Sequence, residues 1–425
     1  MYDEKSRKKF LRYANSTLTK TAPNFDFKSI ATKGINLGLI NDREADLFVS
    51  KSIIPNILLE EKVVKKISPA KFNGNYESCI VDNSIAVEYN SPSGYDISPA
   101  ALQKFKRTTS RSPEITINKY GRSMHFVKNF LQISWGENFI YYQAPQNSNS
   151  SDYIKNYLDR AEPIHLGNIF HAVVEGSGIY THWMLDTLPR LLYLKTNGYD
   201  LNKFDNILLA SCDKKFQITI LNMLDIDRSK IITRAKNGSF FSASSCTYVT
   251  NPRQGFTASR KTYSLIKEFL TSNLSASQDE LPEKIYVSRR KASKRKITNE
   301  PELIAFLKKF DFQEVILEDL EISQTLQIFE KAKIIIAPHG AGLSNLVYAN
   351  ENANIIEIFS AHISIEYWKI ANEIGLNYYV FQGNYPIDFT AKTVDIFIPS
   401  NQKNSMDIKV DLLRFKDFLE HYDII

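Results

Sequence analysis

The C-terminal third of the chain alternates between short apolar runs and segments with apolar residues at helical spacing. Strands are expected at residues 284–290, 312–318, 333–338, 353–359 and 377–383. Helices are expected at residues 299–310, 322–332, 342–349 and 364–375. This rhythm predicts an α/β fold with a doubly wound parallel sheet.

Upstream of this region the pattern is also α/β, from about residue 165 onward. Strands are expected at residues 170–176, 204–212 and 229–235, and helices at residues 180–198 and 216–224. The junction between two domains is expected between residues 253 and 280, where a helix is followed by a polar stretch.

The length of 425 residues exceeds what one hydrophobic core normally supports, so more than one domain is expected. Residues 1–60 show short helical patterns and are expected to form a helical extension. Residues 61–260, strand-rich at first, form one expected domain, and residues 261–400 form the Rossmann-like one. Residues 401–425 end the chain in an amphipathic helix.

The composition is that of a globular protein, with 43% hydrophobic and 24% charged residues. The net charge of +6 is spread along the chain and is too small for a nucleic-acid-binding surface. It suits an anionic substrate or an anionic membrane surface. A solvated basic surface is the alternative.

The three cysteines, Cys79, Cys212 and Cys246, form no CxxC pair. We expect reduced, buried thiols, with neither a disulfide framework nor a metal site. No run approaches the roughly 18 apolar residues of a membrane span. The N-terminus also lacks the apolar core of a signal peptide. The expected location is the cytoplasm, with peripheral contact at the inner face of the membrane as an alternative.

Where the strand at 333–338 ends, two glycines flank an alanine in the motif PHGAG, residues 338–342. Ligands of open α/β sheets bind beyond the carboxyl ends of the strands. The glycines allow a sharp turn and a close approach of the backbone, and the N-terminus of the following helix attracts anions. A phosphate site is expected here, to which His339 adds a hydrogen bond or a charge. A tight turn with a satisfied histidine is the alternative.

Basic residues follow the neighbouring strand and reach the same edge of the sheet. They are Arg289, Arg290, Lys291, Lys294, Arg295 and Lys296. Arginine binds phosphate through a planar fork of donors. A solvated basic loop is the alternative, above all for the lysines.

Glu357 lies in the otherwise apolar strand 353–359, where an unpaired carboxylate would be costly. The hydroxyl groups of a ribose are one natural partner for it. An internal salt bridge is the alternative.

His182 and Asp186 are four residues apart, which places them on one face of the helix at 180–198. Either can act as a general base for a hydroxyl group. We favour Asp186, because a partly desolvated carboxylate has a raised pKa. An ion pair on the helix surface is the alternative.

Asp225 and Asp227 form a DxD sequence, which can bind a divalent metal against a diphosphate. They lie between a helix and a strand, where aspartates commonly serve turns and caps. We favour the turn, and no metal ligands are expected.

Several of these motifs, taken in order, resemble glycosyltransferase family 61. They are HWxxDxLPR from residue 182, YVSRR from residue 286, IIAPHGAGLSNLVYA from residue 335, IIEIF and EYW. The resemblance covers about residues 165–380 and is most specific from 284 to 359. Residues 1–160 match no motif of the family, so the resemblance does not extend to the acceptor.

The resemblance implies an inverting glycosyltransferase of GT-B architecture, in which two Rossmann-like domains face each other across a cleft. Because arginines at a helix N-terminus can stabilise a leaving diphosphate, and because the DxD is read as a turn, we expect a metal-independent enzyme. The C-terminal domain would bind a nucleotide-sugar, most simply a UDP-sugar, and no cofactor is implied. The N-terminal domain would offer an oligosaccharide or lipid-linked glycan acceptor, as in capsular polysaccharide biosynthesis. The donor-binding residues implied are Arg289, Arg290, Arg295, His339, Gly340, Ala341, Gly342, Leu343, Asn345 and Glu357, with Asp186 or His182 as the base.

Two other functions remain open at this point. One is a non-catalytic nucleotide- or glycan-binding protein. The other is a nicotinamide-dependent oxidoreductase, which is disfavoured because the expected GxGxxG after a first strand is missing. The sugar, the acceptor and the oligomeric state are not defined by the sequence.

Overall fold

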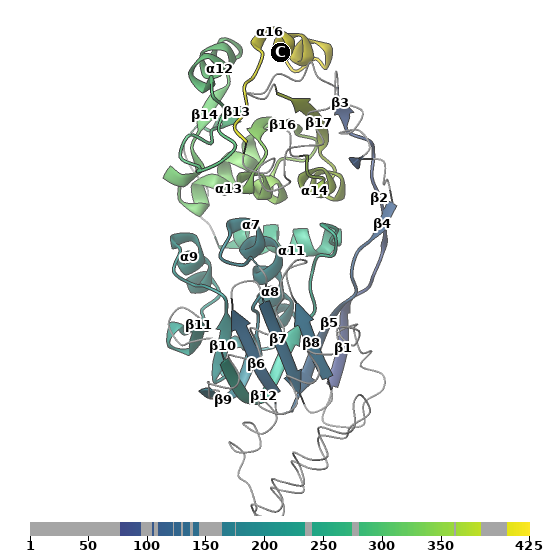
Figure 1. The fold of residues 1–425 in the computed structure, drawn as a ribbon, viewed down its shortest axis with the longest axis vertical. Coiled ribbons are helices and arrows are strands. Elements are labelled where there is room, and N and C mark those ends of the chain that lie inside the picture. The colour runs from purple at the N-terminus through teal and green to yellow at the C-terminus, as the bar shows by residue number, and fades with distance from the viewer. Residues whose placement is uncertain are drawn as a thin grey trace, which may run out of the picture. The chain divides into compact units, whose positions relative to one another are not determined.

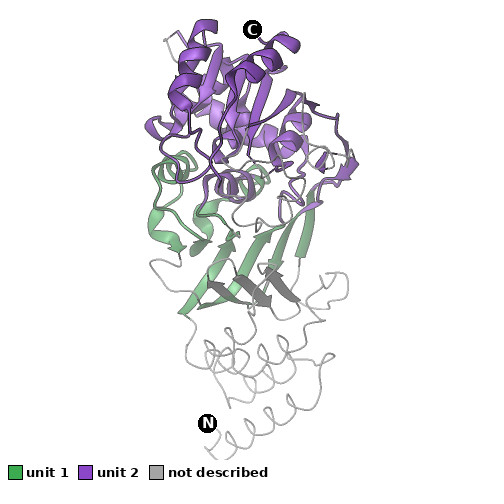
Figure 2. Ribbon diagram, turned by 45° about the horizontal axis from the view of Figure 1, so that its top comes forward, with its two compact units in different colours: residues 1–81, 116–178, 193–250 green, residues 82–115, 179–192, 251–425 purple. Residues whose placement is uncertain are grey.

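The chain divides into two compact units, each described here by itself (Figure 2). Unit 1 comprises residues 1–81, 116–178 and 193–250, and unit 2 comprises residues 82–115, 179–192 and 251–425. A computed structural model describes residues 77–94, 104–105, 109–121, 123–128, 131–136, 139–143, 164–174, 176–233, 240–273, 280–360, 363–383 and 406–425.

Unit 2 contains a six-stranded sheet in which each strand runs parallel to its neighbours (Figure 1). In order across the sheet, the strands are β14 (Gln313–Val315), β13 (Lys284–Val287), β15 (Ile334–Pro338), β16 (Asn354–Phe359), β17 (Asn377–Gln382) and β3 (Ser93–Gly94). All except β3 lie where the alternating pattern predicted strands. The predicted parallel α/β fold is therefore confirmed for this region.

The helices of unit 2 also follow the predicted pattern. They are α11 (Arg260–Ser272), α12 (Glu300–Leu307), α13 (Ile322–Lys331), α14 (Glu366–Ile374) and α16 (Leu412–His421). The segment predicted as a helix at 342–349 is a 3-10 helix, η7 (Ala341–Tyr348). It differs from the predicted α-helix in its hydrogen bonds, which join residues three positions apart and not four.

One face of this sheet carries a large apolar core. Ile336, Ile356 and Phe381 are fully buried there and pack with Phe415 of α16 and with side chains of α12. Each such side chain contributes about 1.5–3 kcal/mol by leaving water. Because side chains alternate along a strand, Glu357 points to the other face of the sheet.

Unit 1 contains a nine-stranded mixed sheet. Its parallel part consists of β11 (Ile231–Thr233), β10 (Asn206–Leu209), β9 (Ile164–His171) and β12 (Phe240–Val249), in that order. Its antiparallel part consists of β1 (Glu77–Asp82), β5 (Ile115–Tyr120), β6 (Ser123–Lys128), β7 (Leu131–Gly136) and β8 (Phe139–Gln143). A parallel Rossmann-like arrangement therefore describes one part of this sheet.

The sequence predicted β10, β11 and the helix between them, α9 (Lys215–Met223), but it was less accurate for β9 and β12. It placed a strand at 170–176, whereas β9 spans Ile164–His171. The apolar residues 172–174 follow the strand, while polar His165 and Asn168 lie within it and weaken its apolar signal. No pattern indicated β12.

The predicted helix at 180–198 changes its hydrogen bonding along its length. α7 (Tyr180–His182) leads into a π-helix, η2 (Trp183–Thr187), which leads into α8 (Leu188–Thr196). Pro189 has no N–H group to donate to the helical hydrogen-bond pattern. It disturbs that pattern less here than in a regular α-helix, because the preceding π turn is already widened. Gly198 lies just beyond α8 in the left-handed region, as its place at the predicted helix end suggested.

The two units differ from the predicted domain boundaries. Residues 82–115 and 179–192 cluster with unit 2, although both fall inside the predicted domain 61–260. The reason for 179–192 is a set of polar contacts to η7, α14 and the residues after β12, described below. The predicted helical extension at 1–60 lies outside the described residues.

The cysteines differ in their surroundings. All three are free thiols, and Cys212 and Cys246 are buried as expected, whereas Cys79 on β1 is exposed. Among the described residues, no helix has both the length and the apolarity needed to span a membrane.

Gly375 ends α14 with φ of +82°, as its position in the sequence predicted. We predict that Gly375→Ala lowers the free energy of unfolding by about 1 kcal/mol, because L-residues pay for the left-handed conformation. Urea denaturation measures the change. The control is Gly178→Ala: a Cβ there meets no atom within 4 Å and the backbone is not left-handed. Equal losses in both variants would contradict the explanation.

Candidate active site

Segments far apart in the sequence meet within unit 2 on the face of the sheet that carries Glu357. Tyr180 donates a 2.6 Å hydrogen bond to Asn345 of η7. Ser344 of η7 donates a 2.7 Å hydrogen bond to Thr181. The hydroxyl groups of Thr181 and Tyr367 of α14 lie 3.4 Å apart. These contacts fix α7 beside the HGAG loop and the start of α14.

Asp186 lies at the centre of a buried ionic network. Arg253 holds its carboxylate with two parallel hydrogen bonds, from Nε at 2.7 Å and from Nη2 at 2.8 Å. The remaining Nη1 of Arg253 donates at 2.7 Å to Glu366. The side chains of Arg253 and Asp186 are 5% and 7% exposed. This fork geometry is among the strongest ion-pair arrangements that side chains form.

His182 is the member of this network nearest to solvent. Its Nδ1 lies 2.8 Å from Asp186 Oδ2, and its side chain is 36% exposed. A carboxylate can only accept, so Nδ1 carries the proton and the lone pair of the neutral ring is on Nε2. The hydrogen bond to Asp186 raises the pKa of His182, against the effect of burial.

The structure reverses the expected pKa of Asp186. Burial by itself would raise it, but the charge and hydrogen bonds of Arg253, together with those of His182, hold the pKa well below its usual range. The expectation of a raised pKa was wrong because it left out Arg253, which is 67 residues away in the sequence. Asp186 is therefore a poor proton acceptor, and its geometry is that of a residue that orients His182.

The π-helix η2 places side chains of one short segment both in the ionic network and in the apolar core. All five residues of η2, including Asp186, are buried. A π turn widens the helix and changes the direction of its side chains, and such turns are frequent at functional sites.

Arg289 and Arg295 lie close enough for the charge of Arg295 to act on Arg289, and among the described residues neither forms a direct salt bridge. Burial and the charge of Arg295 both lower the pKa of Arg289, and burial lowers that of Arg295. Arg289 Nη2 donates to the carbonyl group of Lys294 at 3.1 Å. Within the part of the chain that the structure describes, the buried Nε atoms of both arginines lack a hydrogen-bond acceptor. Two crowded guanidinium groups with unused donors form a site that favours an anion.

The backbone of Arg295 also shows strain. Its φ is +57°, in the left-handed region that residues with a Cβ rarely adopt. Such conformations cost about 1–3 kcal/mol and concentrate at functional sites.

His339 lies beside these arginines and contacts the carboxyl group of Glu357, a residue of the sheet strand β16. Its Nδ1 is 2.5 Å from Glu357 Oε1, and the Tyr378 hydroxyl group donates to the other oxygen of Glu357. Burial, together with the charges of Arg295 and Arg289, lowers the pKa of His339 to about 3. Burial also raises the pKa of Glu357, which opposes the charged form of its carboxyl group.

Glu357 is therefore part of an internal pair with His339, which is the alternative to a ribose contact that the sequence left open. Its side chain is 0% exposed, and both oxygens contact protein groups. It supports and orients His339 from behind, so we no longer assign it to the ribose.

The glycines of the HGAG loop have different roles, and neither requires a left-handed backbone. A Cβ on Gly340 would collide with the guanidinium group of Arg289, so this glycine makes room for the arginine. A Cβ on Gly342 would lie 2.7 Å from Leu317 Cδ1, so this glycine permits close packing. The sequence predicted that a phosphate approaches these glycines, which stays a prediction; the groups that the structure places against them are the side chains of Arg289 and Leu317.

The other predicted donor-binding residues divide into three groups. Ala341 is half-buried in the first turn of η7. Leu343 and Asn345 are buried, and Asn345 is held by Tyr180 and by the carbonyl group of Gly342. Arg290 pairs with Glu314 of β14, and Lys291 pairs with Asp319. Arg290 thus belongs to a different side-chain cluster from Arg289.

The Asp225–Asp227 pair is a turn, as favoured. Asp225 is left-handed, and Asp227 caps the 3-10 helix η4 (Arg228–Lys230) by accepting from the backbone N–H of Ser229 at 2.9 Å.

Sequence reasoning missed Arg253 and Glu366. The EYW motif contains Glu366 and Tyr367, but their partners lie elsewhere in the chain. A buried carboxylate at Asp186 requires a cationic partner. The sequence therefore indicates that such a partner exists, but it does not indicate which residue supplies it.

Comparison with known proteins confirms the family resemblance over the middle of the chain. Residues 180–356 match the model of the family described as glycosyltransferase 61. The segment includes His182, Asp186, Arg253, Arg289, Arg295 and His339, and it ends just before Glu357.

Curated relatives match over shorter stretches. The chain is 28% identical over 186 residues to the alpha-1,3-arabinosyltransferase XAT2 of Oryza sativa subsp. japonica, covering 38% of this chain and 31% of that protein. It is 34% identical over 109 residues to the EGF domain-specific O-linked N-acetylglucosamine transferase of Drosophila melanogaster, covering 24% and 21%. The chain thus spans about a third or less of the length of these relatives.

Among solved structures, the bacterial iron-containing dodecameric glycosyltransferase TibC of enterotoxigenic E. coli H10407 matches with a TM-score of 0.27 at 10% identity. The match covers 64% of this chain and 81% of that one. A similarity this low adds nothing to the description of the site.

Arg253 tests how strongly the network stabilises the protein. We predict that Arg253→Met lowers the free energy of unfolding by about 3–5 kcal/mol, because it removes the guanidinium charge from the buried carboxylate of Asp186 and from the partly buried one of Glu366. Arg253→Lys keeps the charge but loses the fork, so its loss should be smaller. Chemical denaturation at neutral pH measures both. A loss below about 1 kcal/mol for the methionine variant, the size of an exposed pair, would refute the assigned role.

Proposed function

We propose that this chain, whose residues 180–356 match glycosyltransferase family 61, transfers a sugar from a nucleotide-sugar to the hydroxyl group of a glycan. The observation that carries the proposal is the pair Arg289 and Arg295 beside the HGAG loop, whose buried Nε atoms lack an acceptor within the described part of the chain. Their unused donors and like charges fit the diphosphate of a nucleotide-sugar. A UDP-sugar is the donor expected from the resemblance, and no cofactor is proposed.

The diphosphate would lie against the guanidinium groups and the first backbone N–H groups of η7. Arginine forks and backbone donors both bind phosphate oxygens strongly. His339, held neutral by burial and by the charges of Arg295 and Arg289, can donate or accept without adding a third positive charge. These groups stabilise the negative charge that grows on the leaving diphosphate. In this proposal the arginines do what a divalent cation does in other transferases.

The base in this proposal is His182, with Asp186 as its orienting partner. Nε2 of neutral His182 takes the proton of the acceptor hydroxyl group while the acceptor oxygen attacks the anomeric carbon. The bond from that carbon to the diphosphate breaks, and the diphosphate leaves with the electron pair. Attack from the opposite side inverts the anomeric configuration. Asp186 stabilises the imidazolium that forms, as buried carboxylates do behind histidine bases.

The remaining parts of the proposal rest on the resemblance. They are a GT-B-like pair of domains, an oligosaccharide or lipid-linked glycan as acceptor, and a place in the synthesis of a capsular or other surface polysaccharide. An exposed free thiol at Cys79 suits a reducing compartment such as the cytoplasm.

Donor binding tests the first half of the proposal. We predict that Arg289→Ala weakens binding of a nucleoside diphosphate by about 1.5–3 kcal/mol, the range of hydrogen bonds to charged groups. Calorimetry in the presence of EDTA measures the affinity. The matched control is the adjacent Arg290→Ala, which removes an arginine already paired with Glu314.

Three outcomes of that titration would count against the proposal. Equal effects of the two variants would show that general charge and not this site binds the ligand. Unchanged affinity in Arg289→Ala would remove the assignment altogether. If binding requires manganese, a metal ion and not the arginine pair holds the diphosphate.

The pH dependence tests the base. His182 must be neutral to accept a proton, so turnover should rise with pH through the raised pKa of His182, above its ordinary value of about 6.5. Asp186→Asn removes the partner that raises this pKa, so the acid limb should move to lower pH. His182→Ala should lower turnover about 10²–10⁴-fold and leave donor affinity nearly unchanged.

Steady-state rates across pH, with donor titrations for each variant, provide the measurement. If His182→Ala keeps both its rate and the acid limb, the base lies elsewhere. If Asp186→Asn abolishes turnover at every pH while His182→Ala does not, Asp186 is the base. Donor binding without any turnover would favour a non-catalytic nucleotide-binding protein.

A further inference from the structure

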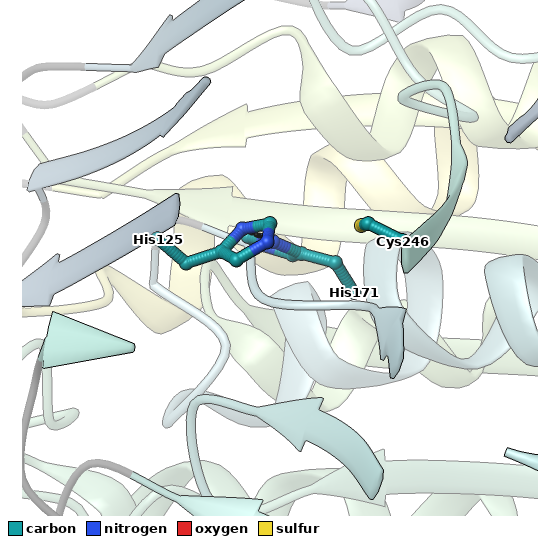
Figure 3. Close-up of side chains that lie close together, drawn as sticks. All are labelled: His125, His171 and Cys246. Carbon is teal, nitrogen blue, oxygen red and sulfur yellow. Dashed lines mark hydrogen bonds between the residues drawn. The ribbon is translucent and has the colours of Figure 1, made fainter. Parts of the chain in front are cut away.

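Unit 1 contains a second cluster of chemically active side chains that the proposed transfer does not use. His125 of β6, His171 of β9 and Cys246 of β12 converge from three neighbouring strands (Figure 3). The two imidazole rings contact each other, with their Nδ1 atoms 2.8 Å apart, and the sulfur atom of Cys246 points toward them. One donor atom from each residue lies within 4.8 Å of the other two.

All three side chains are sealed in the interior. His125 and His171 are 0% exposed, and Cys246 is 2% exposed. Polar groups in such a place cost free energy unless they are satisfied. The Nε2 of His125 lies 2.8 Å from the Ser123 hydroxyl group, an outer contact of the kind that orients a ligating histidine.

The types of donor define the class of ligand. Two imidazole nitrogens and a thiolate are the preferred ligands of zinc and copper ions. Magnesium and calcium need several oxygen ligands, and this cluster supplies no carboxylate. The chemistry therefore favours a transition metal ion over a hard cation.

The distances need only a small adjustment. Two nitrogens bound to one zinc ion at about 2.0–2.1 Å and a tetrahedral angle lie about 3.3 Å apart. The Nδ1 atoms are at 2.8 Å, so the rings would separate by roughly half an ångström. The sulfur–nitrogen distances, which are at most 4.8 Å, would shorten to about 3.6 Å through rotation of the Cys246 and histidine side chains.

We propose that His125, His171 and Cys246 bind one zinc or copper ion, which joins β6, β9 and β12 inside unit 1. The thiol loses its proton to the solvent as the metal–sulfur bond forms. Because the site is closed to solvent, the ion stabilises the fold and does not take part in the transfer. No metal motif exists in the sequence, since the ligands are 46 and 75 residues apart in the chain.

The experiment uses the full chain, purified without chelators or added metal and analysed by inductively coupled plasma mass spectrometry. We expect about one ion per chain, and the element detected separates zinc from copper. Protein stripped under denaturing conditions with a reductant is then refolded with cobalt(II) or copper(I). Cobalt bound to the thiolate should give an intense sulfur-to-metal charge-transfer band, and metal should raise the Tm by about 5 °C.

Matched variants locate the ion. Cys246→Ala should lower metal affinity by more than about 100-fold, beyond the loss from changing an outer-shell partner, whereas the buried Cys212→Ala should retain it. His171→Gln should lose the ion, and His165→Gln, which changes a histidine of the same strand, should keep it.

Substoichiometric metal in the purified chain, with neither a thiolate band nor a Tm shift on titration, would overturn the proposal. That measurement uses the unmodified chain, so it decides the question even if a variant fails to fold. Equal loss of metal in Cys246→Ala and Cys212→Ala would also refute the site.

Discussion

The bidentate contact between Arg253 and Asp186 is the interaction on which the candidate active site depends. Both side chains are almost fully buried, and neither charge is tolerable there without the other. The pairing draws the segment 179–192 into unit 2, because Arg253 also binds Glu366 at the start of α14. Once Asp186 is held in this way, His182 has a fixed tautomer and a fixed direction.

The same unit handles its buried polar groups in two ways. The network of Asp186 is ionic, because a guanidinium group supplies a matched charge. At the pair of His339 and Glu357, burial and two nearby positive charges oppose the imidazolium, and burial opposes the carboxylate. Among the described residues, the buried Nε atoms of Arg289 and Arg295 still lack an acceptor. Unused guanidinium donors of this kind favour an anion.

Glycine contributes to this arrangement through its missing side chain. Gly340 has an extended backbone that any residue can adopt, with φ of 166°, and the guanidinium group of Arg289 occupies the space of an absent Cβ. In unit 1 the strands instead bring two histidines and a cysteine into contact in the core.

The sequence alone determined the parallel sheet of unit 2, since β13, β14, β15, β16 and β17 lie in runs whose apolar period is local. It also determined the HGAG loop at the end of β15, the capping role of Asp227 and the glycine ends of two helices, because these depend on neighbours along the chain. Only the tertiary structure decided the partner of Asp186, the pairing of Glu357 with His339 and the cluster around Cys246. These contacts join residues between 18 and 121 positions apart in the chain. Burial and charge determine such contacts, and a local sequence pattern does not record either.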